Sequence, residues 1–278
     1  MDSSTRAPWP PEWPRTAPLG RTWLGIVLLG VLAAGALATG IAGLADGTPV
    51  VLVIGLLFAI ALGLTATYLV VRSIRPRFRR SDILATTDRD GTPVTRIRQS
   101  ALLFHLRTGI VAALALAFAI SAIDHYLSTG NEGLLGVLIY VLLAAFFGSY
   151  VLAATTGALA PGHLDLSPQG VHHRGWSFEA TMPWRTLIVA QPVFEDRHRG
   201  IQLIGDPGKK WEHAYTVRLW RIDRVALVPI IDLDTRRFPI PPDVLATFLA
   251  HYAVAAPDRA ELGTDRALAR IDRWWPQS

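Results

Sequence analysis

The sequence predicts a membrane protein with four transmembrane helices (membrane all-α) and a cytoplasmic β-rich domain that closes with a helix. Three observations lead to this fold class: four uncharged apolar runs, a one-sided distribution of basic residues, and a change of composition near residue 158. Of the 278 residues, 51% are hydrophobic and 18% are charged, whereas soluble domains carry about a quarter charged residues. The composition therefore favours segments that face lipid over a wholly soluble or disordered chain.

The four candidate membrane spans are residues 23–45, 47–71, 108–123 and 133–162. A helix across the bilayer core needs roughly 20 apolar residues, and three of the runs supply them. The third run has 16 residues, and it spans if Arg107 snorkels on one side and residues 125–127 extend it on the other. The first run is too long for the apolar region of a cleaved signal peptide, so we expect it to be retained.

The basic residues predict the orientation of these spans. Three of them precede the first span, nine lie between the second and third, and fifteen follow the fourth. The connections between spans one and two, and between three and four, carry none. Because Lys and Arg concentrate in cytoplasmic loops, we expect a multi-pass protein of the plasma membrane with both termini in the cytoplasm.

The predicted organisation has three parts. Residues 1–20 form a Pro-rich cytoplasmic tail, residues 21–157 hold the four helices with a cytoplasmic Arg-rich loop at 72–107, and residues 158–278 form the β-rich domain. The stretch 11–14 of the tail has the spacing P-x-x-P of a docking peptide. The interpretation we favour is instead that Trp9, Trp13 and Trp23 lie at the membrane interface, where aromatic residues are enriched.

Five arginines directly after the second span are candidate ligands for lipid headgroups: Arg72, Arg75, Arg77, Arg79 and Arg80. Such a juxtamembrane cluster attracts anionic lipid at about 1 kcal/mol per residue. The predicted partner is therefore the anionic inner leaflet. The alternative is that the cluster only fixes topology.

The first helix carries small residues at four-residue spacing: Gly30, Ala34, Ala38 and Ala42. Small residues let two helix backbones approach closely in a membrane. This ridge predicts helix packing, within the chain or in a homo-oligomer formed through the transmembrane helices.

Short alternating runs predict seven strands, at residues 163–166, 171–174, 177–182, 186–194, 201–204, 214–220 and 225–231. Seven consecutive strands indicate a curled antiparallel sheet or small barrel. Pro241 and Pro242 then begin a helix with one apolar stripe, and Thr264 or Asp265 caps a second. We expect the first of these helices to plug the open end of the sheet.

Two motifs in this part resemble the start of bacterial pleckstrin-homology-like (PH-like) domains. They are Leu164-x-Leu-x-x-x-Gly170-Val-x-x-Arg174 and Met182-Pro-Trp184, in which Gly170 is the turn glycine after strand one and Trp184 opens strand four. Thr186 stands where the family often has an acidic residue. Many such domains in high-GC actinobacteria are fused to membrane helices, and 25 arginines against two lysines fit such a genome. The resemblance implies a fold and a binding role, and it implies no reaction.

The sequence predicts neither catalysis nor a bound metal or cofactor. The chain has no cysteine, no His-Glu-x-x-His and no Gly-x-Ser-x-Gly. His172 and His173 are neighbours, so in a strand they point to opposite faces. Residues 158–278 hold 15 basic and 14 acidic residues, which argues against nucleic-acid binding.

Three functions are consistent with these observations. The first is a non-enzymatic scaffold or regulatory and assembly factor whose PH-like module binds protein or anionic lipid. The second is a small transporter or channel component, which the lack of ionisable residues in mid-span disfavours. The third is a membrane-embedded enzyme that acts on lipid.

Overall fold

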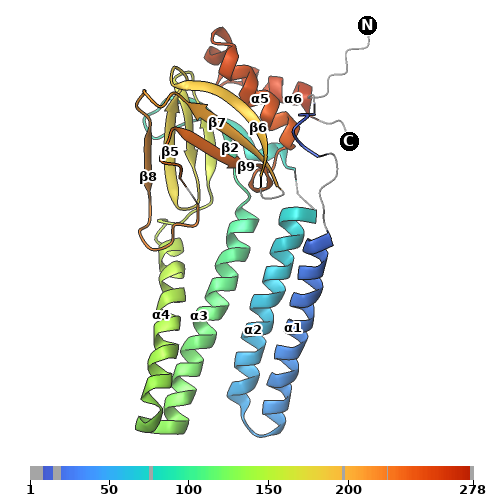
Figure 1. The fold of residues 1–278 in the computed structure, drawn as a ribbon, viewed down its shortest axis with the longest axis vertical. Helices are drawn as coiled ribbons and strands as arrows, with labels where there is room; N and C mark the ends of the chain where they lie inside the picture. The colour runs from blue at the N-terminus through green and yellow to red at the C-terminus, as the bar shows by residue number, and fades with distance from the viewer. Residues whose placement is uncertain (1–8, 15–19, 75–77, 196–197, 224, 276–278) are drawn as a thin grey trace. The chain divides into compact units, whose positions relative to one another are not determined.

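The computed structural model describes residues 9–14, 20–74, 78–195, 198–223 and 225–275. These residues form two compact units, each described here by itself (Figure 1). The helical unit contains residues 20–74 and 101–159. The β-unit contains residues 9–14, 78–100 and the described part of 160–275.

The helical unit contains α1 (Gly20–Ala45), α2 (Pro49–Leu69), α3 (Ala101–Thr129) and α4 (Leu134–Thr155). Within it, α1 packs on α2, α2 on α3 and α3 on α4 (Figure 1). Among the described residues, three helical segments are long and apolar enough to cross a membrane: Gly20–Ala45, Pro49–Ser73 and Ala101–Thr155. The last of these comprises α3, a 3-10 turn at Gly130–Gly133, and α4. The helix expected at 108–123 is therefore longer than predicted, since it begins at Ala101 and includes Arg107.

Glycines bring α1 and α2 together. A Cβ added to Gly55 would lie 2.6 Å from the Ala36 oxygen, and one added to Gly43 would lie 2.6 Å from the Val51 Cβ. The predicted ridge does not supply this approach: Gly30, Ala34, Ala38 and Ala42 are all exposed. The contact face of α1 toward α2 holds Gly40 and Gly43, and the packing role of the four ridge residues stays a prediction.

The β-unit contains two antiparallel sheets. The larger has the order β1-β2-β3-β4-β5-β8 and the smaller the order β6-β7-β9. The strands are β1 (Ile83–Thr87), β2 (Pro93–Arg98), β3 (His163–Leu166), β4 (Gly170–Arg174), β5 (Phe178–Pro183), β6 (Leu187–Glu195), β7 (His198–Gly205), β8 (Glu212–Tyr215) and β9 (Ile230–Asp234). All seven expected strands have a counterpart, although β8 begins and ends earlier than predicted and β9 begins and ends later.

Strands β1 and β2 lie in the stretch 72–107, which is predicted to be an Arg-rich loop of the helical part. Asp88 to Thr92 form their turn, in which Gly91 has φ 80°, a conformation that glycine adopts without strain. Strand β2 then pairs with β3, for example Ile97 opposite Leu164. The β-unit therefore includes more of the chain than residues 158–278.

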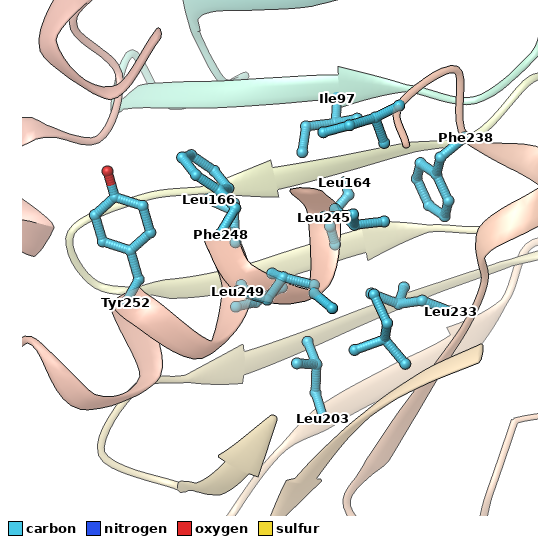
Figure 2. Close-up of a cluster of buried hydrophobic side chains, with 14 of the residues drawn as sticks. Ile97, Leu164, Leu166, Leu203, Leu233, Phe238, Leu245, Phe248, Leu249 and Tyr252 are labelled. Atoms are coloured by element: carbon cyan, nitrogen blue, oxygen red, sulfur yellow. The ribbon is translucent and has the colours of Figure 1, made fainter. Parts of the chain in front are cut away.

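The core lies between the sheets and α5 (Pro242–Val254), as Figure 2 shows. Four side chains of α5 point toward the strands: Leu245, Phe248, Leu249 and Tyr252. They meet Ile97 of β2 as well as leucines of β3, β7 and β9. The hairpin formed by β1 and β2 thus supplies part of the same core. A last helix, α6 (Asp265–Trp274), is capped by Thr264, whose hydroxyl accepts from the Arg266 amide at 3.3 Å.

Candidate functional site

The chain enters or leaves the β-unit near Arg79, Ser100 and Ala160, and each of these residues is fixed by its amide. Arg79 donates to the Pro239 oxygen at 2.8 Å, Ser100 to the Arg237 oxygen at 2.7 Å, and Ala160 to the Trp176 oxygen at 3.4 Å. We call this part of the β-unit the connection end. It also contains a buried polar cluster.

Asp223 and Arg237 form the centre of that cluster. Asp223 accepts from the amides of Trp176 at 2.8 Å and Ser177 at 3.2 Å, and it pairs with the Arg237 guanidinium. That guanidinium also lies over the Trp176 ring, 4.6 Å from its centroid. Burial alone would raise the pKa of Asp223, but Arg237 and the amide donors outweigh it and hold the pKa below its usual value. Asp223 is therefore charged, and the cluster rigidly joins the β4–β5 turn to the segment after β9.

His173 lies beside this cluster and is fully buried. Its Nε2 is 3.1 Å from the Gln99 side-chain nitrogen, and its ring packs on Phe178 with centroids 5.2 Å apart. Burial lowers the pKa of His173 to about 3, so the ring is neutral at physiological pH. Within the described ranges, His, Asp and Glu side chains form no group of three suited to a metal.

A second buried ion pair joins the hairpin to the C-terminal segment. Arg96 of β2 and Asp165 of β3 are directly opposite in register. Their side chains form a bidentate pair, with Nε to Oδ1 at 2.8 Å and Nη2 to Oδ2 at 2.6 Å. His163 lies 3.5 Å from the same carboxylate, yet burial lowers the pKa of His163 to about 4. Arg96 is accordingly the main countercharge of Asp165.

Residues 9–14 of the Pro-rich tail pack on a surface of the β-unit. Residues 9–14 form a turn, closed by the Trp13 amide donating to the Pro10 oxygen at 3.2 Å. The Trp13 side chain is only 2% exposed, and its indole nitrogen donates to the Val193 oxygen at 2.8 Å. Val193 lies on β6, an edge strand of the smaller sheet. Trp13 thus anchors the segment in the β-unit, and Pro11 and Glu12 remain exposed.

Arg199 of β7 holds the two ends of the same segment. Its guanidinium lies over the Trp9 ring, 4.5 Å from the centroid, and donates to the Pro14 oxygen at 2.9 Å. Burial lowers the pKa of Arg199, and the nearby Asp243 carboxylate acts in the opposite direction. We call the surface formed by Val193 and Arg199 the Trp13 site. Sequence reasoning found the segment and assigned Trp9 and Trp13 to the membrane interface, whereas both pack on the β-unit.

The structure describes three of the five predicted headgroup ligands, and they belong to different units. Arg75 and Arg77 lie outside the described residues, and Arg72 belongs to the helical unit, 5.8 Å from the Tyr68 ring centroid. Arg79 is exposed in the β-unit. Arg80 pairs with Asp272 of α6 and donates to the Ile83 oxygen at 2.9 Å. The charge of Arg80 is thus used inside the unit.

Gly170 and Trp184, the two residues of the predicted PH-like signature, both have structural roles in the β-unit. A Cβ on Gly170 would lie 2.6 Å from the Met182 oxygen, so β4 and β5 meet closely there. Trp184 is buried and its indole nitrogen donates to the Ser167 oxygen at 2.7 Å. Comparison of the chain with protein-family models, with curated proteins and with solved structures found no match.

Proposed function

We propose that this chain is a four-pass membrane protein with cytoplasmic termini, and that its PH-like β-unit is a binding module for a short Trp-containing peptide segment. Each of α3 and α4 is long enough to cross a bilayer core of about 30 Å, because their 29 and 22 residues extend about 43 and 33 Å at the helical rise. The one-sided distribution of basic residues supports the orientation.

The observation that carries the binding role is the burial of Trp13 against β6. Residues 9–14 contribute a turn rather than a strand, so the two sheets are complete without them. The segment contacts the β-unit through the indoles of Trp9 and Trp13 and the carbonyl of Pro14. Pro11 and Glu12 are exposed. A ligand with this pattern has an aromatic anchor, an indole hydrogen bond to an edge strand, and a cation–π contact with Arg199.

The tail therefore acts as an occupant of the Trp13 site in the same chain. A covalently attached segment has an effective concentration in the millimolar range for a short flexible linker. A partner segment with a similar Trp would compete with it, and a free site would then appear only when the tail is displaced. This arrangement suits a regulatory or assembly factor whose partner is recognised at the membrane.

A labelled peptide of residues 7–20 tests this proposal. We expect it to bind the full-length Trp13→Ala protein in detergent with higher affinity than the wild-type chain, whose own tail fills the site. An additional Arg199→Gln substitution should weaken this binding, because the guanidinium contacts both Trp9 and the Pro14 carbonyl.

The matched control is the same peptide with Trp13 replaced by Ala, which should not bind. Thermal unfolding of the Trp13→Ala protein shows whether the β-unit stays folded. If the wild-type peptide binds neither protein while the β-unit is intact, the Trp13 site is only a structural contact. Reporters at Ser278 and within residues 128–131 test the topology separately, and should give opposite orientations.

A further inference from the structure

The segment between β8 and Asp223 carries an unusual set of exposed residues. Leu219 is 62% exposed, and Arg218 and Arg221 on either side of it are exposed as well. Trp220 is half-buried. The nearest acidic residue in sequence, Asp223, is buried and neutralised by Arg237. The exposed surface of residues 218–221 is therefore apolar and positive.

This segment is held at the connection end of the β-unit. At its start, the Thr216 amide donates to the Ser177 oxygen at 2.9 Å. At its end, Asp223 accepts from the Trp176 and Ser177 amides. Trp176 in turn accepts from Ala160. Both ends of the segment are thus fixed to Ser177 or its neighbour Trp176, and Trp176 also anchors the chain after α4.

Two short covalent connections join this end of the β-unit to the helices that we propose to span the bilayer. Ser100 directly precedes Ala101, the first residue of α3, and Ala160 follows the last residue of α4, Thr155, by five positions. A stretch of five residues reaches at most about 18 Å. The exposed residues 218–221 are attached to the same part of the β-unit backbone.

We propose that residues 218–221 form an anionic-lipid contact, in which Arg218 and Arg221 bind headgroup phosphates and Leu219 enters the interfacial region. This inference rests on the proposed membrane-spanning topology. Arg guanidinium groups bind phosphate oxygens in bidentate geometry, and half-buried tryptophans such as Trp220 favour the membrane interface. Arg79, exposed and fixed at the same end through Pro239, adds a further positive charge.

The cysteine-free chain makes this contact directly testable. The Leu219→Cys protein, labelled with an environment-sensitive fluorophore, is reconstituted in vesicles of phosphatidylcholine with or without phosphatidylglycerol. We expect a blue-shifted emission and quenching by lipid-attached nitroxides, both stronger with the anionic lipid. The control is Val254→Cys, 86% exposed at the last position of α5, whose label should emit as in water in both vesicles.

A charge variant and an extraction assay complete the test. Adding Arg218→Gln and Arg221→Gln to the labelled protein should reduce the emission shift in anionic vesicles to that in neutral ones. A label at residue 219 that emits as in water in both vesicles overturns the lipid contact, provided that the protein resists alkaline extraction. If alkali extracts the protein from the vesicles, the proposed membrane-spanning topology is wrong. The lipid contact, which rests on that topology, is then wrong as well.

Discussion

The interactions that stabilise the helical unit internally differ from those that stabilise the β-unit internally. In the helical unit, neighbours in the chain are neighbours in space, and α1 and α2 approach through Gly40, Gly43 and Gly55. In the β-unit, segments far apart in the chain are joined by Arg–Asp pairs. Arg96 pairs with Asp165 and Arg80 with Asp272, across 69 and 192 positions.

This difference follows from how each unit brings its segments together. Short connections hold α1 beside α2 and α3 beside α4, so apolar packing and small residues are sufficient there. A strand that arrives from a distant segment must also find its register, because a shift by one residue turns every side chain to the other face. An ion pair directly across two strands, such as Arg96 with Asp165, stabilises one register only.

Removal of the hairpin formed by β1 and β2 should have the largest effect on the stability of the β-unit. Residues 160–278 without it should not fold cooperatively, because β3 would lose its partner β2 and Asp165 its countercharge. We expect no cooperative urea unfolding of this fragment, monitored by near-UV circular dichroism. Residues 78–100 joined to 160–275 by a short Gly-Ser linker should restore it, because the Gln99 amide lies 2.8 Å from the Gly162 oxygen.

Arg96→Gln should be the most damaging single substitution in the hairpin. It leaves the buried Asp165 carboxylate without its main partner, and breaking a buried ion pair costs about 3 kcal/mol. The matched control is Arg98→Gln, two residues along the same strand and exposed, which should change stability by less than about 0.5 kcal/mol. Urea unfolding of the purified full-length chain measures both, and equal effects would show that the ion pair does not fix the hairpin.

A glycine of the helical unit provides the corresponding test there. Gly55→Leu should separate α1 from α2 and cost about 1–3 kcal/mol, as overpacking does, because its Cβ would lie 2.6 Å from the Ala36 oxygen. At Gly63 on the same helix, an added Cβ would meet no atom of the described chain within 4 Å, so Gly63→Leu should be nearly neutral. Thermal unfolding in detergent compares them. A larger loss at Gly63 would contradict the assignment of the contact face.

Acid should weaken the β-unit before it affects the helical unit. Burial lowers the folded-state pKa of His163 to about 4 and of His173 to about 3, whereas unfolded histidine titrates near about 6.5. As pH falls below that value, the unfolded chain binds protons that the folded chain does not, so stability decreases toward pH 4. His163→Gln should remove part of this dependence. A melting temperature independent of pH between 6.5 and 4.5 would contradict neutral histidines in the fold.

Much of the architecture could be predicted because it is determined by patterns of residues that are close in the sequence. The apolar runs, the seven strands after residue 160 and the Thr264 cap all follow from neighbouring residues. The hairpin was missed although Asp90-Gly91 is a strong turn signal between the strands at 83–87 and 93–98. Its neighbour in the sheet is 65 or more residues away, and no local pattern encodes that pairing.

Identical local sequences can be followed by different elements, and this limits what the sequence predicts for the fold and for the candidate site. The pentapeptide Asp-Gly-Thr-Pro-Val occurs at 46–50 and at 90–94, with a left-handed glycine in both copies. It leads into a helix in the first copy and into a strand in the second. The turn is local and the element after it is set by tertiary packing. In the same way, Trp13 is identifiable from sequence as a conspicuous aromatic residue, but its position against Val193 depends on a contact across 180 positions.

A pair of cysteines across β2 and β3 tests most directly whether the β-unit is assembled from distant segments. Arg98 and His163 are opposite each other in register, and such partners lie about 4.5–5.5 Å apart, within the range of a disulfide. In the cysteine-free chain, Arg98→Cys with His163→Cys should form an intramolecular disulfide in oxidised membranes. It should form as fast as His172→Cys with Thr181→Cys, a pair from β4 and β5. If the second pair closes while the first stays reduced, the hairpin is not part of the sheet.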